Sequence, residues 1–155
     1  MNTVEQGLTE SGFSFVSKDL NRPWGAFWVI KEQDAFLQKY FPDQISILGQ
    51  DTMISPKILY VAPGKRLSWQ YHHRRKEVWR VVDGPVGVIR SRTDEPGPLD
   101  THDQGDLIIL EKEERHRLIG LDQPGLVAEI WVHIDPSNPS DEDDIIRIRD
   151  DFSRS

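Results

Sequence analysis

The stretch that decides the fold runs from Gly64 to Gly84 and reads GKRLSWQYHHRRKEVWRVVDG. Within it, Gln70 and His72 are separated by a single residue, and Glu77 follows a few residues later. Side chains alternate between the two faces of an extended chain, so Gln70 and His72 point the same way. After a tight turn, Glu77 can return beside them on the next strand. The spacing therefore predicts three polar side chains that converge on one point.

A second segment, residues 105–116, supplies His116 from a hairpin far along the chain. Two imidazoles, one carboxylate and one amide oxygen form a mixed set suited to zinc, ferrous iron, manganese, cobalt or nickel. No thiolate competes, because the chain has no cysteine. Alone, His72 or His116 is better interpreted as an ordinary core or surface histidine. The two-part spacing with flanking glycines favours one divalent metal ion, zinc first, held by Gln70, His72, Glu77 and His116.

The rest of the chain indicates an all-β domain with little helix. Short apolar, β-branched runs are separated by Gly, Pro and Asp, which is typical of a β-barrel or sandwich. These runs are 26–30, 58–61, 67–71, 78–82, 86–90, 107–110, 118–119 and 127–134. Helical spacing predicts one short helix over residues 32–41, ended by Pro42. Residues 1–19 are polar and aperiodic, which predicts a mobile or loosely docked arm before a single domain over residues 20–155.

Composition excludes several classes of function. The net charge of −7 over 155 residues argues against nucleic acid or an anionic membrane as a partner. The length fits one domain and is too short for a nucleotide-binding domain beside a barrel. The absence of cysteine excludes disulfides, thiolate catalysis and iron–sulfur ligation. We find no apolar run long enough to span a membrane and no signal-peptide pattern, so we expect a cytoplasmic protein.

Charge is unevenly distributed around the metal motif. Residues 65–82 carry six basic side chains against one acid, Glu77, in a chain that is acidic elsewhere. The basic residues are Lys65, Arg66, Arg74, Arg75, Lys76 and Arg80. Arginine forks bind phosphate oxygens in pairs, so this basic island predicts a phosphate-bearing substrate. The alternative is that each is a solvated strand end or an ion-pair partner.

Alternation also assigns the two faces of the first motif strand. Arg66, Ser68, Gln70 and His72 share the face expected to line the barrel. Leu67, Trp69 and Tyr71 share the other face, which is unusually aromatic for a surface exposed to solvent. We therefore expect that face to pack against another sheet flank or a second subunit, and we expect a homodimer. His73 should face away from the metal, and His133 is better interpreted as a satisfied strand histidine than as a metal-site residue.

The two-part motif resembles those of the cupin superfamily, whose small antiparallel β-barrels carry a glycine-flanked first motif and a later motif that ends in histidine. The order Gln, His, Glu, His is similar to that of the type II phosphomannose isomerases, which stand alone or form the C-terminal domain of mannose-1-phosphate guanylyltransferases. Three stretches carry the resemblance over about residues 20–154: RPWG at 22–25, PGKRLSWQYHHRRKE at 63–77 and EDDIIR at 142–147. The resemblance implies a jelly-roll-like barrel with short helical segments near both termini.

It also implies an aldose–ketose isomerase that interconverts mannose 6-phosphate and fructose 6-phosphate through a cis-enediol on a divalent metal. Arg75, which matches the arginine of the family's motif, would stabilise enediolate charge or grip the phosphate. Arg66 and Arg147 are further candidates for substrate contacts. The general base is left open between Glu129, Lys65 and a metal-bound hydroxide.

Three other functions remain open at this point. The chain could isomerise or epimerise another sugar phosphate on the same scaffold, because fold and metal do not fix substrate. Arg74 stands where the family usually has a third histidine, and Glu111–Glu113 replaces its Pro-x-Gly turn, which keeps a non-catalytic sugar-binding or metal-sensing cupin in consideration. An oxygen-using iron cupin is the third alternative.

Overall fold

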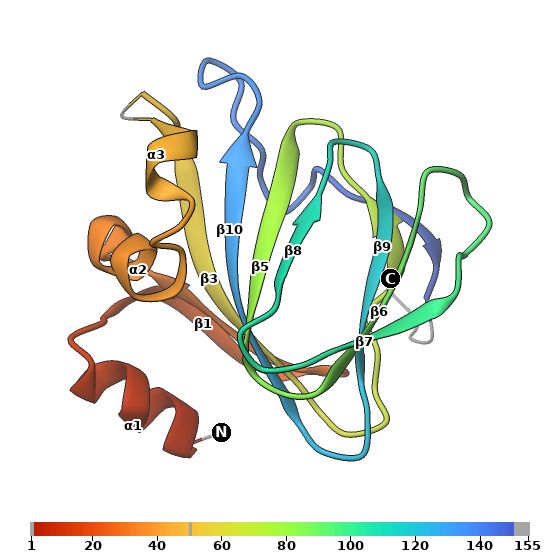
Figure 1. The fold of residues 1–155 in the computed structure, drawn as a ribbon, viewed down its shortest axis with the longest axis horizontal. Helices are drawn as coiled ribbons and strands as arrows, with labels where there is room; N and C mark the ends of the chain where they lie inside the picture. The colour runs from red at the N-terminus through yellow and green to blue at the C-terminus, as the bar shows by residue number, and fades with distance from the viewer. Residues whose placement is uncertain (1, 50, 151–155) are drawn as a thin grey trace.

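The computed structural model describes residues 2–49 and 51–150, and Figure 1 shows its fold. The helices are α1 (Asn2–Glu10), α2 (Gln33–Tyr40) and α3 (Ile45–Leu48). The strands are β1 (Phe15–Arg22), β2 (Gly25–Ile30), β3 (Ile54–Val61), β4 (Trp69–Tyr71), β5 (Arg75–Asp83), β6 (Val86–Ser91), β7 (Leu99–His102), β8 (Leu107–Leu110), β9 (Arg115–Gly120), β10 (Gly125–His133) and β11 (Ile146–Arg149).

The strands form two antiparallel sheets. The first has the order β1-β2-β3-β10-β5-β8, and the second has the order β11-β4-β9-β6-β7. Figure 1 shows the sheets leaning together, with the helices beside β1 and β3 on the side away from the second sheet. Each sheet keeps two edge strands, so the two are not closed into a continuous barrel. The prediction of an all-β antiparallel fold is confirmed, with two open sheets in place of a closed barrel.

Alternation along the central strands divides the interior into two cores. On β10, Ala128 and Ile130 pack with Phe36 of α2 in a core under the helices. Val127, on the opposite face of β10, packs in a second core together with Leu118 of the other sheet. The next residues on that face therefore point into the space between the sheets. On β3 and β5, alternate residues likewise point into the space between the sheets. Polar side chains from the adjacent strands β3, β10 and β5 therefore meet there.

The N-terminal segment differs from its prediction. Residues 2–10 form helix α1, and the proposed boundary after residue 19 falls inside β1. Leu8 and Phe13 are 5% and 4% exposed and belong to the core under the helices. The described part of this segment is therefore packed on the domain, and the expectation of a loosely docked arm is wrong for it. Burying these apolar side chains offsets the cost of ordering a mostly polar helix.

Other local predictions had mixed outcomes. The helix expected over residues 32–41 is confirmed as α2, and α3 was not expected. Near the C-terminus, the described residues form strand β11, where a short helix was expected. Trp69 does not need a second subunit to cover it, because its indole nitrogen donates to the Asp94 carbonyl at 2.7 Å and the side chain is 1% exposed. Within the described residues, no helix combines the length and apolarity needed to cross a membrane.

Candidate metal centre and active-site cavity

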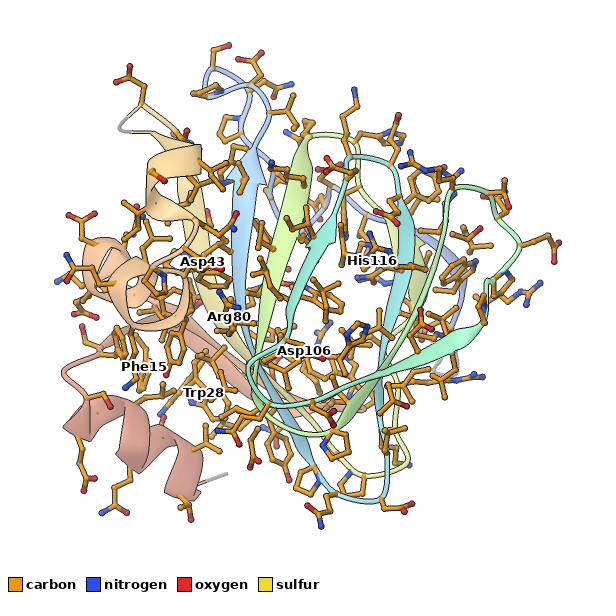
Figure 2. All side chains as sticks on the ribbon, viewed as in Figure 1. Phe15, Trp28, Asp43, Arg80, Asp106 and His116 are labelled. Atoms are coloured by element: carbon orange, nitrogen blue, oxygen red, sulfur yellow. The ribbon has the colours of Figure 1, made fainter. Side chains whose placement is uncertain are left out.

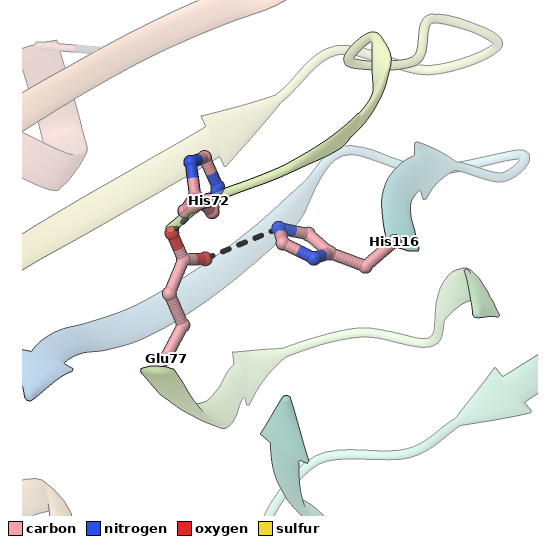
Figure 3. A group of neighbouring side chains, drawn as sticks. All are labelled: His72, Glu77 and His116. Atoms are coloured by element: carbon pink, nitrogen blue, oxygen red, sulfur yellow. Dashed lines mark ion pairs between the residues drawn. The ribbon is translucent and has the colours of Figure 1, made fainter. Parts of the chain in front are cut away.

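The predicted metal ligands meet between the two sheets. Figure 3 shows His72 in the turn before β5, Glu77 on β5 and His116 on β9, with their polar ends directed toward one another. One ligand atom from each lies within 4.8 Å of the others, and all three side chains are buried. Gln70 on β4 is the cross-strand partner of His116, and it lines the adjoining cavity. Three predicted ligands thus converge, and the fourth is their neighbour.

Both imidazole rings direct Nε2 toward the point where the three side chains meet. His72 Nδ1 lies 2.7 Å from the carbonyl oxygen of Asp144, and His116 Nδ1 lies 3.0 Å from that of Glu114. A carbonyl oxygen only accepts, so each Nδ1 donates and each neutral ring keeps its lone pair on Nε2. The two Nε2 atoms lie 3.1 Å and 3.4 Å from the oxygens of Glu77. A hydrogen bond at the far nitrogen is how proteins commonly orient a metal-binding histidine.

His116 Nε2 gives a direct test of whether a cation fits. Among the described residues this buried atom has no hydrogen-bond partner, and such an orphaned polar group costs about 1–3 kcal/mol. Burial lowers the pKa of His72, against the opposing charge of Glu77, so this ring offers a lone pair at neutral pH. Lone pairs facing a carboxylate repel it unless a cation lies between them. The residues present therefore fit a divalent metal ion bound by nitrogen and oxygen.

Arg75 supplies positive charge on the other side of Glu77. Its Nε donates to Glu77 Oε2 at 2.8 Å, and one terminal nitrogen lies 3.2 Å from His72 Nε2. Burial raises the pKa of Glu77, but the Arg75 charge is foremost among the causes that outweigh it and hold that pKa well below its usual value. Glu77 is therefore a carboxylate at neutral pH, as a metal ligand must be.

The remaining nitrogen of Arg75 is also occupied. It donates to Ser140 Oγ at 2.9 Å and to the Asp141 carbonyl at 3.2 Å. The guanidinium lies over the Trp131 ring, 3.6 Å from its centroid. Arg75 is thus a buried cation with a partner at every nitrogen, and its contacts are those of a residue that holds Glu77 in place.

A second buried carboxylate, Glu129 on β10, lies beside Glu77. Its two oxygens accept hydrogen bonds from the indole nitrogens of Trp131 at 2.9 Å and Trp79 at 2.8 Å. Burial, together with the Glu77 charge, raises the pKa of Glu129 to about 8. A carboxyl group with a pKa near neutrality can take up and return a proton. Of the two side chains considered as bases from the sequence, Glu129 lines the cavity and Lys65 does not.

Two of the candidate metal ligands, Gln70 and Glu77, line a cavity of about 70 Å³. Gln70, Arg75, Glu77 and Glu129 line it, and Arg147 of β11 joins them. Arg22 and Trp24 of the RPWG stretch also line it. The cavity is thus walled by charged and aromatic groups.

Two predicted residues lie elsewhere. Lys65 and Arg66 are exposed in the connection between β3 and β4 and are not part of the cavity lining. The local reason is that β4 is only three residues long, so the alternation that was expected to carry Arg66 inward does not extend that far. Leu67, expected on the outer face, lines the cavity for the same reason.

The basic island is dispersed in the structure. Figure 2 shows Arg80 beside Asp43, well away from His116, and its Nε donates to the Tyr40 carbonyl at 2.9 Å. Arg74 points to the C-terminal segment, where it pairs with Asp141 at 3.1 Å. These residues therefore follow the alternative reading of ion-pair partners, and they do not form a common phosphate patch.

The other histidines of interest behave as expected. His73 is exposed and lies 2.8 Å from Glu113. His133 is buried and fully engaged, with Nε2 2.7 Å from Ser55 Oγ and Nδ1 accepting from the Ser140 backbone at 2.9 Å. His133 is therefore a satisfied strand histidine.

Sequence reasoning missed two residues that shape the site. Lys57 on β3 is 8% exposed and lines the cavity; the available signal was a lysine inside the mostly apolar run around 54–61. Asp144 is 6% exposed, and its carboxylate accepts from the backbone N–H groups of His73 and Arg74, both at 2.9 Å. Its carbonyl orients His72, and no local sequence pattern indicates that contact.

Comparisons with known proteins find relatives over most of the chain. The Xanthan biosynthesis protein XanB of Xanthomonas campestris pv. campestris is 32% identical over 134 residues, which cover 86% of this chain and 23% of XanB. The mannose-1-phosphate guanylyltransferase of Escherichia coli K12 is 28% identical over 144 residues, covering 90% of this chain and 24% of the enzyme. The chain thus spans about a quarter of the length of these relatives.

Among solved structures, the oxalate decarboxylase of Lactobacillus farciminis in complex with formate matches with a TM-score of 0.56 at 18% identity, covering 84% of this chain and 33% of that one. At that identity the match shows the shared cupin fold alone. The family model described as "Mannose-6-phosphate isomerase C-terminal" matches residues 43–150. That range contains both motifs, Glu129 and the C-terminal segment, and the chain belongs to this family.

Proposed function

We propose that this chain is a metal-dependent aldose–ketose isomerase that interconverts mannose 6-phosphate and fructose 6-phosphate, with zinc as the first metal to test. One observation carries the proposal. Glu129, a buried carboxyl group with a pKa raised to about 8, lies beside Glu77 of the candidate metal centre and lines the same cavity. An isomerase of this kind needs a metal and a base within reach of the same two carbons.

A bound divalent metal would supply Lewis acidity toward the sugar oxygens at C1 and C2. Glu129 then takes the proton from C2 of the open-chain aldose. The C2–H electron pair forms the C1–C2 double bond, and the C1 carbonyl pair moves onto O1. Glu129 returns its proton to C1, the O2 proton passes to O1, and the carbonyl forms at C2. Atoms and charge balance, and no redox partner is needed.

Other residues position this chemistry. The indoles of Trp79 and Trp131 hold the Glu129 carboxylate by one hydrogen bond at each oxygen. Arg75 fixes the Glu77 carboxylate against the candidate metal position. Both roles cost little reorganisation during the reaction because the side chains are already buried and bonded.

The test is a coupled assay of fructose 6-phosphate formation from mannose 6-phosphate. The chain is stripped with chelator and reloaded separately with zinc, cobalt, manganese or nickel. We expect metal-dependent turnover that is lost in Glu129→Gln, which removes the base and keeps the shape, while zinc binding by that variant persists. Lys65→Met, on the exposed β3–β4 connection, is the control and should retain native turnover.

Two results would contradict the proposal. Native chain that binds metal but converts no mannose 6-phosphate with any of the four metals excludes this reaction. Full turnover by Glu129→Gln excludes Glu129 as the base. The expected homodimer stays a prediction, which sedimentation velocity checks independently.

A further inference from the structure

A buried ammonium group lines the cavity and has no part in the proton transfer described above. Lys57 lies on β3 as the cross-strand partner of Glu129, and its side chain is 10% exposed. Its Nζ lies 4.5 Å from the ring centroids of both Phe27 and Trp131. A cation between two aromatic faces is stabilised in its charged form. Lys57 therefore places a positive charge in the cavity lining.

The partner of this ammonium is unusual for a buried charge. Lys57 Nζ donates to Glu142 Oε1 at 3.0 Å, and the Glu142 side chain is 68% exposed. Buried charges normally have equally buried partners, because a partner in water is screened and held weakly. An ammonium has three N–H donors, and among the described residues Glu142 is the hydrogen-bonding partner that the structure shows for it. The pair is thus a deep cation covered by a carboxylate at the cavity mouth.

A second cation adjoins the first. Arg22, at the end of β1, lines the same cavity, and its guanidinium carbon lies 5.9 Å from the Phe27 centroid. Its Nε is buried and has no hydrogen-bond partner among the described residues. The nearest carboxylate in an ion pair with it, Asp19, is 3.8 Å away. Two positive groups therefore flank one ring, with donor capacity that the protein leaves unused.

We propose that Lys57 and Arg22 bind the phosphate group of the substrate, and that Glu142 occupies the same position on Lys57 in the free protein. This assignment rests on the proposed function for the sugar part of the substrate. A phosphate group carries about −1.5 to −2 charge at pH 7 and three strong acceptor oxygens. It therefore competes well against a single exposed carboxylate, which regains its hydration on release.

Two of the alternatives among the basic residues fit less well. Arg75, the arginine expected to grip phosphate, has a partner at each nitrogen, including Glu77 and His72. Arg66 is exposed and outside the cavity lining. Lys57 and Arg22 instead lie on the first sheet, in the cavity lining that Glu129 shares. A sugar phosphate bound there would place its sugar carbons between the phosphate cations and the metal ligands.

The test measures binding of inorganic phosphate to the full chain, freed of metal so that phosphate has no metal to coordinate. Trp24 and Trp131 line the cavity, so tryptophan fluorescence reports occupancy, with potassium chloride at matched ionic strength as the salt control. Removing the Lys57 ammonium in Lys57→Met should weaken phosphate binding by about tenfold or more. Lys65→Met, which removes an exposed lysine outside the cavity, should leave it unchanged.

Glu142→Gln provides a prediction of opposite sign at an exposed position where folding is not at risk. Removing the competing carboxylate should tighten phosphate binding by about two- to fivefold. Weaker binding in Glu142→Gln, or equal losses in Lys57→Met and Lys65→Met, overturns the assignment. Native chain whose fluorescence responds to phosphate no more than to chloride overturns it as well.

The same variants separate this inference from the proposed reaction. Phosphate binding that depends on Lys57, in a chain that converts no mannose 6-phosphate, leaves the anion site standing and rejects the reaction. Turnover in Lys57→Met with an unchanged KM for mannose 6-phosphate rejects the anion site and leaves the reaction standing.

Discussion

Replacing Arg75 with methionine tests the account of the buried charges most directly. The guanidinium donates to Glu77 Oε2 at 2.8 Å and lies 3.2 Å from His72 Nε2. Glu77 is 2% exposed, so water cannot take over from the lost partner. Methionine keeps much of the side-chain volume over Trp131 and removes the charge. In the metal-free chain, Glu77 then remains as a buried carboxylate without its cation.

The size of the effect follows from that burial. Breaking a buried ion pair by removing one partner costs about 3–5 kcal/mol, because the remaining charge is uncompensated. For a domain of this size each kcal/mol shifts Tm by about 2–4 °C. We therefore expect Arg75→Met to lower the Tm of the metal-free chain by roughly 6–20 °C. Urea unfolding should show the same loss through a lower midpoint at an unchanged m-value.

A double-mutant cycle identifies the cause. Glu77→Gln removes the charge that Arg75→Met leaves stranded, so the double variant should be more stable than the sum of the single losses predicts. Added zinc should raise the Tm of Arg75→Met more than that of the native chain, because in the variant the metal is the cation that neutralises the buried Glu77 carboxylate. Additive losses in the cycle, or a loss below about 1 kcal/mol for Arg75→Met, would refute the reasoning.

Three further predictions concern the metal, the base and a backbone contact. His116→Ala should weaken zinc binding by more than about 100-fold in calorimetry, whereas the exposed His73→Ala should not; equal losses would contradict the assignment. Turnover should rise with pH, because Glu129 must be deprotonated to act as a base. The midpoint should lie between 4.5 and about 8, because a cation at Glu77 offsets part of the negative charge that raises the pKa of Glu129. A pH profile that falls over this range would contradict the role of Glu129 as the base. Gly120→Ala places Cβ 2.0 Å from the Ala62 carbonyl oxygen and should cost about 1–3 kcal/mol in urea unfolding, while Gly7→Ala in α1, with open space around it, should not destabilise.

The cluster of candidate metal ligands was predictable because its geometry is local. Gln70, His72 and Glu77 are close in sequence, on β4, on the short turn after it and on β5. β4 and β5 belong to different sheets, and strand alternation with the short turn between them brings the three side chains together between the sheets. His116 required only that its strand pair with β4, and it does so directly opposite Gln70. The spacing of polar residues along neighbouring strands can be recognised in a single sequence.

Lys57 was not predictable on the same grounds, for a physical reason. Helices cover the outer face of the first sheet, so its central strands are buried on both faces; β10 is buried at eight of its nine residues. Sequence alternation then gives no sign of which face borders the cavity. Lys57 and Ile58 are both buried, on opposite faces of β3. Only the three-dimensional arrangement shows that the face of Lys57 borders the cavity.

The N-terminal helix was missed because its pattern is short. In α1, Val4 and Leu8 are spaced by one helical turn and pack on the core, with few other apolar residues near them. A nine-residue helix is marginal on its own. Its stability comes from tertiary packing, and a window of mostly polar residues does not reveal that packing.

The C-terminal segment contacts three residues of the site that lie on different strands or turns. Residues 140–144 orient His72 through a backbone carbonyl, hold Arg75 through a serine hydroxyl and cover Lys57 with a carboxylate. All three contacts are polar, so water or a ligand can replace each one individually. An incoming phosphate competes only for the contact at Lys57. The contacts to His72 and Arg75 remain, so the anion can enter while the metal ligands keep their orientation.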